Sequence, residues 1–188
     1  MPRTYSHERA PGLAIERATA ADAAALAPAA ASLFEQTFAD ANTPEDMATY
    51  LGRAFTESRQ RGELEDERNL IWIARDIANT AILGYAHLRL DALPAEAPPA
   101  KRGAEIARLY TDRGWHGRGL GAKLMAACIA AGRDAGADVL WLGVWERNAR
   151  AIAFYEKHGF TAIGEQPFML GTDRQRDVVM ALDLTRSR

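Results

Sequence analysis

A glycine-rich turn between a strand-like and a helix-like segment is the part of the sequence best suited to chemistry. It reads His116-Gly117-Arg118-Gly119-Leu120-Gly121 and follows the short run from Glu105 to Thr111. After the turn, Leu120, Leu124 and Cys128 recur with helical spacing and predict one buried helix face. The first N–H groups of a helix have no acceptor inside the helix, and the helix dipole adds positive potential there. Because glycines also let a ligand approach the backbone closely, the turn predicts a phosphate site.

Two classes of phosphate ligand compete for this turn. Residues 117 to 122 satisfy the dinucleotide pattern G-x-G-x-x-G/A. In dinucleotide-binding folds, however, the strand runs straight into the first glycine, and an acidic residue ends the next strand roughly 20 residues later. Here five residues separate Thr111 from Gly117, and the first acid after the predicted strand 139–145 is Glu146. The dinucleotide interpretation is therefore the weaker one, and a turn that binds no ligand is the third alternative.

The same turn resembles the pyrophosphate loop of the GNAT superfamily, the acetyl-CoA-dependent N-acetyltransferases, whose pattern is Q/R-x-x-G-x-G/A. His116 departs from that pattern at its first position. A second motif, from Asn148 to Phe160, reads N-x-x-A-x-x-F-Y-x-K-x-G-F after a strand and is typical of the same superfamily. The segments 34–38, 141–148 and 168–177 together resemble the bacterial PaiA-type spermidine/spermine N-acetyltransferases.

This resemblance implies acetyl-CoA as co-substrate and implies where it is bound. The expected contacts are Leu109, Tyr110 and Thr111 for the pantetheine, and His116, Gly117, Arg118, Gly119, Leu120 and Gly121 for the pyrophosphate, with Asn148 and Lys157 as further contacts. Asn148 is equally explained as a helix N-cap, and Lys157 as a solvated surface charge. No metal is expected, because one cysteine and four histidines without ligand spacing do not form a metal site.

The resemblance also implies a general acid and a general base. Tyr155 would protonate the departing thiolate, although a tyrosine packed inside its helix is the competing interpretation. Glu105 lies where some members of the superfamily carry a base that acts through water, although a glutamate paired with an arginine explains it equally well. A base is needed because a primary amine has a pKa near ~10.4 and arrives protonated.

The amine acceptor is expected on the side covered by the first two helices. Glu35 and Asp40 are the expected substrate contacts, because carboxylates attract a polycation. Spermidine or spermine is the first acceptor class, and a protein N-terminus or another small amine is the alternative. A regulator that binds acyl-CoA without turnover is the alternative from a different functional class.

Composition limits the remaining possibilities. The chain has 188 residues and a net charge of −2, which favours one domain without general attraction to nucleic acid or membrane. Residues 1–12 are polar and predict a disordered segment, and residues 13–188 predict a single domain. A single cysteine and no apolar leader fit a cytoplasmic protein. A homodimer is left open.

The helices and strands that must position these residues can be predicted from the sequence pattern. The predicted helices are 19–39, 44–55, 119–135 and 149–158, with an exposed helix over 56–68 broken near Gly62. The predicted strands are 13–17, 69–75, 80–90, 104–111, 139–145, 160–165 and 176–183, with a proline-rich loop over 91–102. This order predicts an α/β (α+β three-layer) fold, a GNAT-like mixed sheet of about seven strands flanked by helices.

Overall fold

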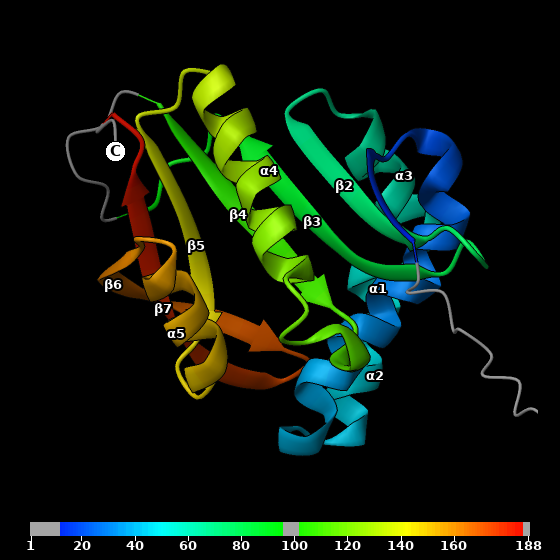
Figure 1. The fold of residues 1–188 in the computed structure, drawn as a ribbon. Coiled ribbons are helices and arrows are strands. Elements are labelled where there is room, and N and C mark those ends of the chain that lie inside the picture. The colour runs from blue at the N-terminus through cyan, green and yellow to red at the C-terminus, as the bar shows by residue number, and fades with distance from the viewer. Residues whose placement is uncertain (1–11, 96–101, 186–188) are drawn as a thin grey trace, which may run out of the picture.

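A mixed seven-stranded sheet with helices on both faces makes up the part of the chain that the computed structural model describes, residues 12–95 and 102–185 (Figure 1). The strand order is β1-β2-β3-β4-β5-β7-β6, and every neighbouring pair is antiparallel except β4 and β5. The strands are β1 (Leu13–Arg17), β2 (Asn69–Asp76), β3 (Ile82–Leu90), β4 (Gly103–Thr111), β5 (Val139–Trp145), β6 (Thr161–Leu170) and β7 (Asp173–Asp183). The helices are α1 (Ala23–Phe38), α2 (Pro44–Ala54), α3 (Glu57–Glu65), α4 (Leu120–Asp134) and α5 (Ala149–Lys157), with 3-10 turns at Ala20–Asp22, Ala39–Ala41 and Arg113–Trp115.

Two hydrophobic clusters hold the helices against opposite faces of the sheet. On one face, Leu124 and Cys128 of α4 pack with Ile106 of β4 and with Tyr155 of α5. On the other face, α1 and α2 pack with β2 and β3 through residues such as Phe34, Met47, Ile71 and Tyr85. The three-layer architecture predicted from the order of elements is therefore confirmed.

The start of α2 has its predicted N-cap and also binds the turn between β6 and β7. Thr43 Oγ1 accepts a hydrogen bond from Asp46 N at 3.2 Å, and Pro44 is the first helical residue. The Asp46 carboxylate accepts hydrogen bonds from Thr172 N at 2.6 Å and from Thr172 Oγ1 at 2.9 Å. These bonds from Thr172 lower the pKa of Asp46. The first turn of α2 thus holds the β6–β7 turn against it.

The predicted end of the strand that begins near residue 160 was wrong. β6 runs from Thr161 to Leu170, well past the predicted residue 165, and it includes Pro167. Proline cannot donate a ladder hydrogen bond, but β6 is an edge strand with β7 as its neighbour, and an edge tolerates proline. Because β6 is longer, its partner β7 also begins earlier, at Asp173 instead of residue 176.

The predicted break in the helix after residue 56 was also wrong. α3 is continuous through Gly62, whose missing side chain would meet only open space. Thr56 caps the helix by accepting a hydrogen bond from Arg59 N at 3.1 Å. Moreover, α3 is not fully exposed, because Gln60 and Glu63 are buried. A glycine costs a helix about 1 kcal/mol, and the cap and the buried contacts offset that cost.

A buried ion pair ties α3 to the middle of the sheet. Arg108 of β4 donates two hydrogen bonds to Glu63, with Nη1–Oε2 at 2.6 Å and Nη2–Oε1 at 3.0 Å. His87 lies fully buried beside them, and its Nε2 is 2.9 Å from Asn69 Oδ1. Burial lowers the pKa of His87 to about 3, so the imidazole is neutral. His87 is therefore a structural residue of this network.

Some predictions fall on residues that the structure does not describe. Residues 1–11 of the predicted disordered segment and residues 96–101 of the predicted loop are among them. Gly12 is described, and its carbonyl accepts a hydrogen bond from Ile77 N at 2.8 Å. Within residues 12–95 and 102–185, no helix has the length and apolar character needed to cross a membrane.

Removing the Glu63 charge should destabilise the fold. Burial alone would raise the pKa of Glu63, but the hydrogen bonds and charge of Arg108 lower it, so the pair stabilises the folded state. Glu63→Gln leaves the Arg108 charge unpaired and should cost about 3 kcal/mol, which is a fall in Tm of about 6–12 °C at pH 7.

The matched control is Glu57→Gln in the same helix. Glu57 is half exposed, pairs with Arg61 at 2.8 Å, and should lose less than about 1 kcal/mol. Thermal denaturation at pH 7 and at pH 3.5 checks both variants. The Glu63→Gln deficit should shrink below a pH of about 4.3, where an unfolded glutamate is protonated. Equal Tm losses in the two variants would contradict a stabilising role for the buried pair.

Candidate active site

Strands β4 and β5 are joined at one end and separate at the other. Only three residue pairs connect them, from Gly103↔Val139 to Glu105↔Trp141, although both strands continue well beyond Glu105 and Trp141. The diverging strands are visible in Figure 1 beneath α4. Along the gap, β4 has no strand partner on its β5 side. Its N–H and C=O groups there remain available to an extended, amide-containing ligand.

A β-bulge in β4 turns its last residues toward the two faces of the sheet. His87 pairs with Arg108 and Leu88 pairs with Ile106, so Ala107 is the extra residue. As a result, Arg108 faces α3, and Tyr110 beyond it packs on Phe34 and Phe38 of α1. Leu109 packs against the opposite cluster under α4. The sequence gives no sign of this bulge, because its residues read as a regular strand.

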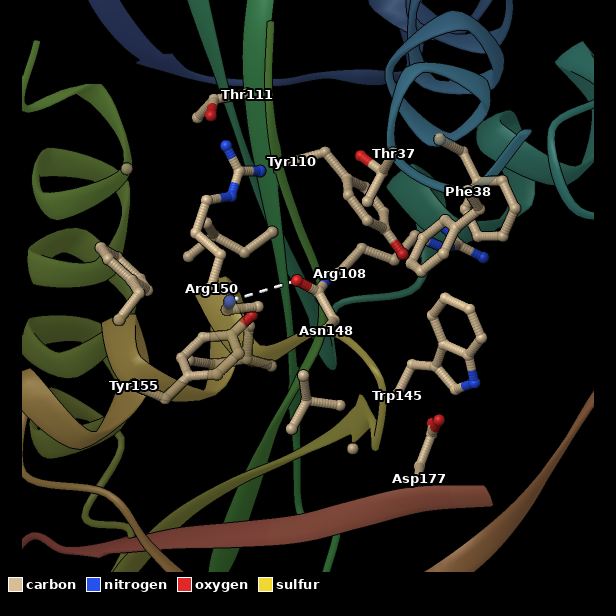
Figure 2. A pocket seen from close by; sticks show the side chains of 18 of the residues that line it. Thr37, Phe38, Arg108, Tyr110, Thr111, Trp145, Asn148, Arg150, Tyr155 and Asp177 are labelled. Atoms are coloured by element: carbon tan, nitrogen blue, oxygen red, sulfur yellow. Dashed lines mark hydrogen bonds between the residues drawn. The ribbon is translucent and has the colours of Figure 1, made fainter. Parts of the chain in front are cut away.

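A cavity of about 530 Å³ lies along the gap, and residues from both faces of the sheet line it (Figure 2). The predicted site residues that line it are Glu105, Leu109, Tyr110, Thr111, His116, Gly117, Gly119, Leu120, Gly121, Asn148, Tyr155 and Lys157. Three predicted residues do not line it: Arg118, Glu35 and Asp40. The structure thus gathers residues from β4, the glycine-rich turn and α5 around one space.

The glycine-rich turn forms the N-terminus of α4, as predicted. Gly119 is the N-cap in a left-handed conformation with φ 81°, and Gly117 has φ 76°. Gly119 has no side chain to accept the first-turn N–H groups, which therefore have no acceptor within the helix. A Cβ at either glycine would meet nothing within 4 Å, so the turn borders open space. The geometry of the turn thus suits an anionic group.

His116 connects this turn to the end of β4. Its Nε2 lies 3.2 Å from the Thr111 carbonyl, and its Nδ1 accepts a hydrogen bond from Arg150. A ring that accepts at Nδ1 and donates at Nε2 is neutral. Consistently, desolvation and the Arg150 charge lower the pKa of His116. His116 therefore stands at the first motif position as a structural link between the turn and β4, and it brings Arg150 to the cavity wall.

Tyr155 is buried in the wall formed by α5. Its side chain is 8% exposed and packs edge-on against Phe154 and tilted against Phe160. Burial raises the pKa of Tyr155 well above its ordinary value, so the hydroxyl keeps its proton at neutral pH. In Figure 2 the hydroxyl points into the cavity. The packed interpretation and the proton-donor interpretation are thus compatible, because the ring packs while the hydroxyl faces the space.

Asn148 uses one end of its amide as a helix cap. Its Oδ1 accepts a hydrogen bond from Ala151 N at 3.2 Å, shown as the dashed line in Figure 2. The Nδ2 group is not needed for the cap, and Asn148 lines the cavity. The cap that the sequence predicted as one alternative is therefore present, and a ligand contact through Nδ2 is compatible with it.

The two predicted phosphate-binding cations differ in position. Lys157 is exposed and lines the cavity from the end of α5. The Arg118 guanidinium lies over the Trp115 ring, 5.7 Å from its centroid, and is outside the cavity wall. In its place, Arg150 contributes a cation to the wall, and the sequence interpretation did not include it.

Glu105 lies at the closed end of the gap. It is the last β4 residue paired with β5, and Arg89 Nη1 donates to its Oε2 at 2.9 Å. Burial raises the pKa of Glu105 although the charge of Arg89 acts in the opposite direction. The predicted arginine-paired state is therefore present, in a residue that also lines the cavity.

The predicted acidic acceptor site is absent from the cavity. Glu35 is exposed on α1, and Asp40 pairs with Arg113 at 3.0 Å while its side chain stays 82% exposed. The cavity-facing side of α1 carries Thr37 and Phe38 instead. The physical reason is helical periodicity, since residues 34, 37 and 38 share one face and residue 35 points away from it.

The far half of the cavity is aromatic with one additional carboxylate. Its rings are those of Phe34, Phe38, Tyr50, Trp145 and Phe168. Asp177 of β7 is 8% exposed and lines the same half, and burial raises the pKa of Asp177 to about 6. Asp177 ends the segment 168–177 that carries the family resemblance, but sequence reasoning gave it no role in the site, although an acidic residue directly before the apolar run 178–182 could have indicated one.

Comparison with known proteins agrees with this geometry. Residues 30–160 match the family described as the Acetyltransferase (GNAT) family. The chain is 37% identical over 164 residues to a protein described as an uncharacterised N-acetyltransferase of Mycobacterium tuberculosis, covering 87% of this chain and 98% of that protein. It is 36% identical over 148 residues to a similarly described protein of Lactobacillus delbrueckii, covering 78% of this chain and 83% of that protein.

Solved structures show the same fold. A PaiA N-acetyltransferase from Thermoplasma acidophilum in complex with coenzyme A superposes with a TM-score of 0.71 at 18% identity, covering 92% of this chain and 99% of that one. A putative acetyltransferase from Salmonella typhimurium with acetyl-CoA gives a TM-score of 0.68 at 20% identity, covering 94% of this chain and 96% of that one.

The family match covers well over half of the chain, and the relatives span most of their own length and of this chain. The predicted resemblance to the GNAT superfamily is confirmed. This chain belongs to the GNAT family and is an acetyl-CoA-dependent N-acetyltransferase.

Proposed function

We propose that the protein acetylates a primary amine by direct attack on the thioester, and that polyamines such as spermidine and spermine are the first acceptor class. The observation that carries the proposal is the gap between β4 and β5. It connects a phosphate-type helix terminus on one side with an aromatic, carboxylate-bearing half on the other. A two-substrate reaction needs such a passage between two chemically different binding regions.

The residues around the gap fit acetyl-CoA. The free edge of β4 at Leu109–Thr111 would hold the pantetheine amides, and the first turn of α4 would hold the pyrophosphate. Asn148 Nδ2 and the Lys157 ammonium are placed to add polar contacts. Bound acetyl-CoA supplies the acetyl group as a thioester whose carbonyl carbon accepts the amine. A backbone N–H near Leu109 or Tyr110 would stabilise charge on the carbonyl oxygen.

Tyr155 would protonate the departing sulfur. Its hydroxyl keeps its proton at neutral pH because burial raises the pKa of the phenol. A free thiol has a pKa near ~8.5 and leaves fairly easily, so the expected contribution is about 100-fold, the low end for a general acid.

Glu105 is the residue that family resemblance offers as proton acceptor. Its carboxylate is bound to Arg89 and lies at the closed end of the gap. It would therefore act through water rather than by touching the amine.

The aromatic half supports a cationic acceptor. Rings such as Phe38 and Trp145, whose centroids are 6.1 Å apart, attract an ammonium group through their π faces. Glu35 and Asp40 enter the proposal only as exposed charges that increase the encounter rate with a polycation, because neither lines the cavity.

One observation favours the alternative of a singly charged amine. Among the described residues that line the cavity, the only carboxylates are Glu105 and Asp177, and Glu105 is already paired with Arg89. A pocket with one free carboxylate matches one ammonium group, such as a protein N-terminus or a small monoamine.

The proposed location is the cytoplasm, where acetyl-CoA is a common metabolite.

Replacing Tyr155 by phenylalanine should slow the chemical step and leave cofactor binding intact. Tyr155→Phe keeps the ring packing and removes only the hydroxyl, so kcat should fall about 100-fold while Kd for acetyl-CoA stays within about twofold. Tyr85→Phe is the matched control, since Tyr85 is fully buried and does not line the cavity. Thiol release and calorimetric titration provide the two readouts. An unchanged kcat, measured when chemistry limits the rate, would leave Tyr155 a packing residue.

The acceptor class can be read from two amines at two salt concentrations. If polyamines are the substrates, kcat/KM should favour spermidine over n-hexylamine, and the preference should shrink as salt rises, since the Debye length is only ~10 Å at 0.1 M. Glu35→Gln and Asp40→Asn should lower kcat/KM for spermidine at low salt only. Equal kcat/KM for both amines at both salt concentrations would remove polyamines and favour the monoamine alternative.

A further inference from the structure

Asp177 lies near the height of the gap at which the proposed function places the acetyl group. In the β5–β7 ladder Asp177 pairs with Trp145, and in the β4–β5 ladder the last pair is Glu105↔Trp141. Trp145 is four residues beyond Trp141, and Leu109 is four residues beyond Glu105 on the parallel neighbour. Because the bulge at Ala107 takes up one residue, Leu109 lies about three ladder steps beyond Glu105 and Asp177 about four. At about 3.3 Å per step, the two residues are within one step of the same height, about 10–13 Å beyond Glu105.

Asp177 is a mostly buried residue whose carboxylate faces the cavity and has no partner in the described part of the chain. Only 8% of the residue is exposed, and no residue in the described ranges donates a hydrogen bond or forms an ion pair with its carboxylate. Glu105, by contrast, is bound by Arg89. Burying an unpaired charge is costly, and a buried polar group without a partner inside the protein indicates a partner from outside.

The surroundings of Asp177 select a cation. Figure 2 shows Phe38, Trp145 and Asp177 along one side of the cavity, with the carboxylate next to the indole. Tyr50 stacks on Phe34 at 4.6 Å and packs on Phe168 at 5.4 Å in the same half of the cavity. Aromatic faces together with one carboxylate form the usual environment of a bound ammonium group.

Gly143 keeps the space over β5 free for this carboxylate. A Cβ at Gly143 would lie 3.0 Å from Asp177 Oδ2 and 2.5 Å from Gln166 Nε2. Its φ is not positive, so the backbone does not require a glycine at this position. The missing side chain therefore provides room, and the room is occupied by two polar groups that face the cavity.

The charged groups on the elements around Asp177 are bound to other partners, as Arg176 beside it is to Glu146 and Glu165. On α2 there is Tyr50, and on β4 there are Glu105, bound to Arg89, and Arg108, bound to Glu63. From the β5–α5 loop, the Arg147 guanidinium lies 5.9 Å from the Trp145 ring centroid. None of these neutralises Asp177, whose pKa is raised by burial alone to about 6, so it is ionised at neutral pH.

We propose that Asp177 binds the ammonium group of the acceptor and removes its proton, an assignment that rests on the amine acetylation proposed above. Asp177, and not Glu105, accepts this proton: one N–H proton moves from the ammonium to the Asp177 carboxylate and then to solvent. The neutral nitrogen attacks the thioester carbon, the C–N bond forms and the C–S bond breaks. The nitrogen loses a second proton, and the sulfur leaves as a thiol with the proton supplied by Tyr155, which regains one. The acceptor nitrogen thus loses two protons in all. One passes through Asp177 to solvent, and the other replaces the proton that Tyr155 gave to the thiol.

The test compares Asp177→Asn with Asp173→Asn, an exposed aspartate on the same strand, and with Glu105→Gln. Asp177→Asn should reduce kcat/KM for n-hexylamine at least about 100-fold at pH 7.5. The ratio of wild-type to Asp177→Asn kcat/KM should fall as the pH drops below about 6, because wild-type Asp177 becomes protonated there. Asp173→Asn should behave as wild type. Glu105→Gln should keep the fall in kcat/KM that the wild type shows below a pH of about 6.

Stability provides a readout that a merely structural role would not give. Since the folded state raises the pKa of Asp177, it disfavours the ionised carboxyl, so Asp177→Asn should raise Tm at pH 7.5 by about 2–4 °C or more. That gain should vanish as the pH falls toward 4. A lower Tm at pH 7.5 would show that Asp177 stabilises the fold through its charge and would overturn the assignment.

Amine binding without turnover separates this assignment from the proposed function. Millimolar n-hexylammonium should raise the Tm of the wild type but not that of Asp177→Asn. The uncharged 1-hexanol should not raise the Tm of the wild type more than that of Asp177→Asn. This result supports the cation site even if no amine is acetylated, in which case only the proposed function fails. If Asp177→Asn keeps both the Tm shift and kcat/KM, the assignment is wrong and the amine acetyltransferase function stands.

Discussion

The early separation of β4 from β5 is the constraint on which the rest of the structure depends. Three residue pairs join the strands, and beyond Glu105 and Trp141 each strand keeps a neighbour on one side only. A sheet that opened in this way without cover would expose unpaired backbone to solvent. Here α4 and α5 cover one face of the opening, α1 and α2 cover the other, and their side chains form the walls of the cavity.

The two faces of the sheet supply different chemistry to the same gap. On the α4–α5 face lie the N-terminus of α4 and the Tyr155 hydroxyl, which suit an anionic cofactor and a departing sulfur. On the α1–α3 face lie the aromatic rings and Asp177, which suit a cation. The bulge at Ala107 makes this division possible, because it turns Arg108 and Tyr110 to the α1–α3 face while Leu109 stays on the other. The buried Glu63–Arg108 pair then holds the bulged strand against α3.

Much of this architecture is readable from the sequence because its signals are local. The N-cap at Thr43, the glycines at the start of α4 and the apolar runs of β1 and β5 all act over a few residues, and the elements they predict are present. The family motifs likewise predicted which segments of β4, α4 and α5 meet around the cavity. Gly62 misled the prediction, since the burial of Glu63 that holds α3 together depends on a partner 45 residues away.

The features that the sequence did not reveal are consequences of pairing between distant strands. Neither the bulge at Ala107 nor the short β4–β5 ladder has a local signature. Glu35 and Asp40 have a different cause: they belong to the predicted helical segment, but helical periodicity sets them outside the cavity wall, which α1 lines with Phe34, Thr37 and Phe38. Asp177 faces the gap only because β7 pairs with β5 in a register that sets it opposite Trp145.

Amide hydrogen exchange with and without acetyl-CoA tests the central claim most directly. If the open edge of β4 and the first turn of α4 hold the cofactor, exchange should slow at least about fivefold at residues 107–111 and 119–122 when acetyl-CoA is saturating. Exchange in β2, which lies in the same sheet but pairs on both sides with β1 and β3, should not change. Protection of residues 119–122 without any change at 107–111, or equal protection throughout the sheet, would contradict the claim that the gap between β4 and β5 is the binding site.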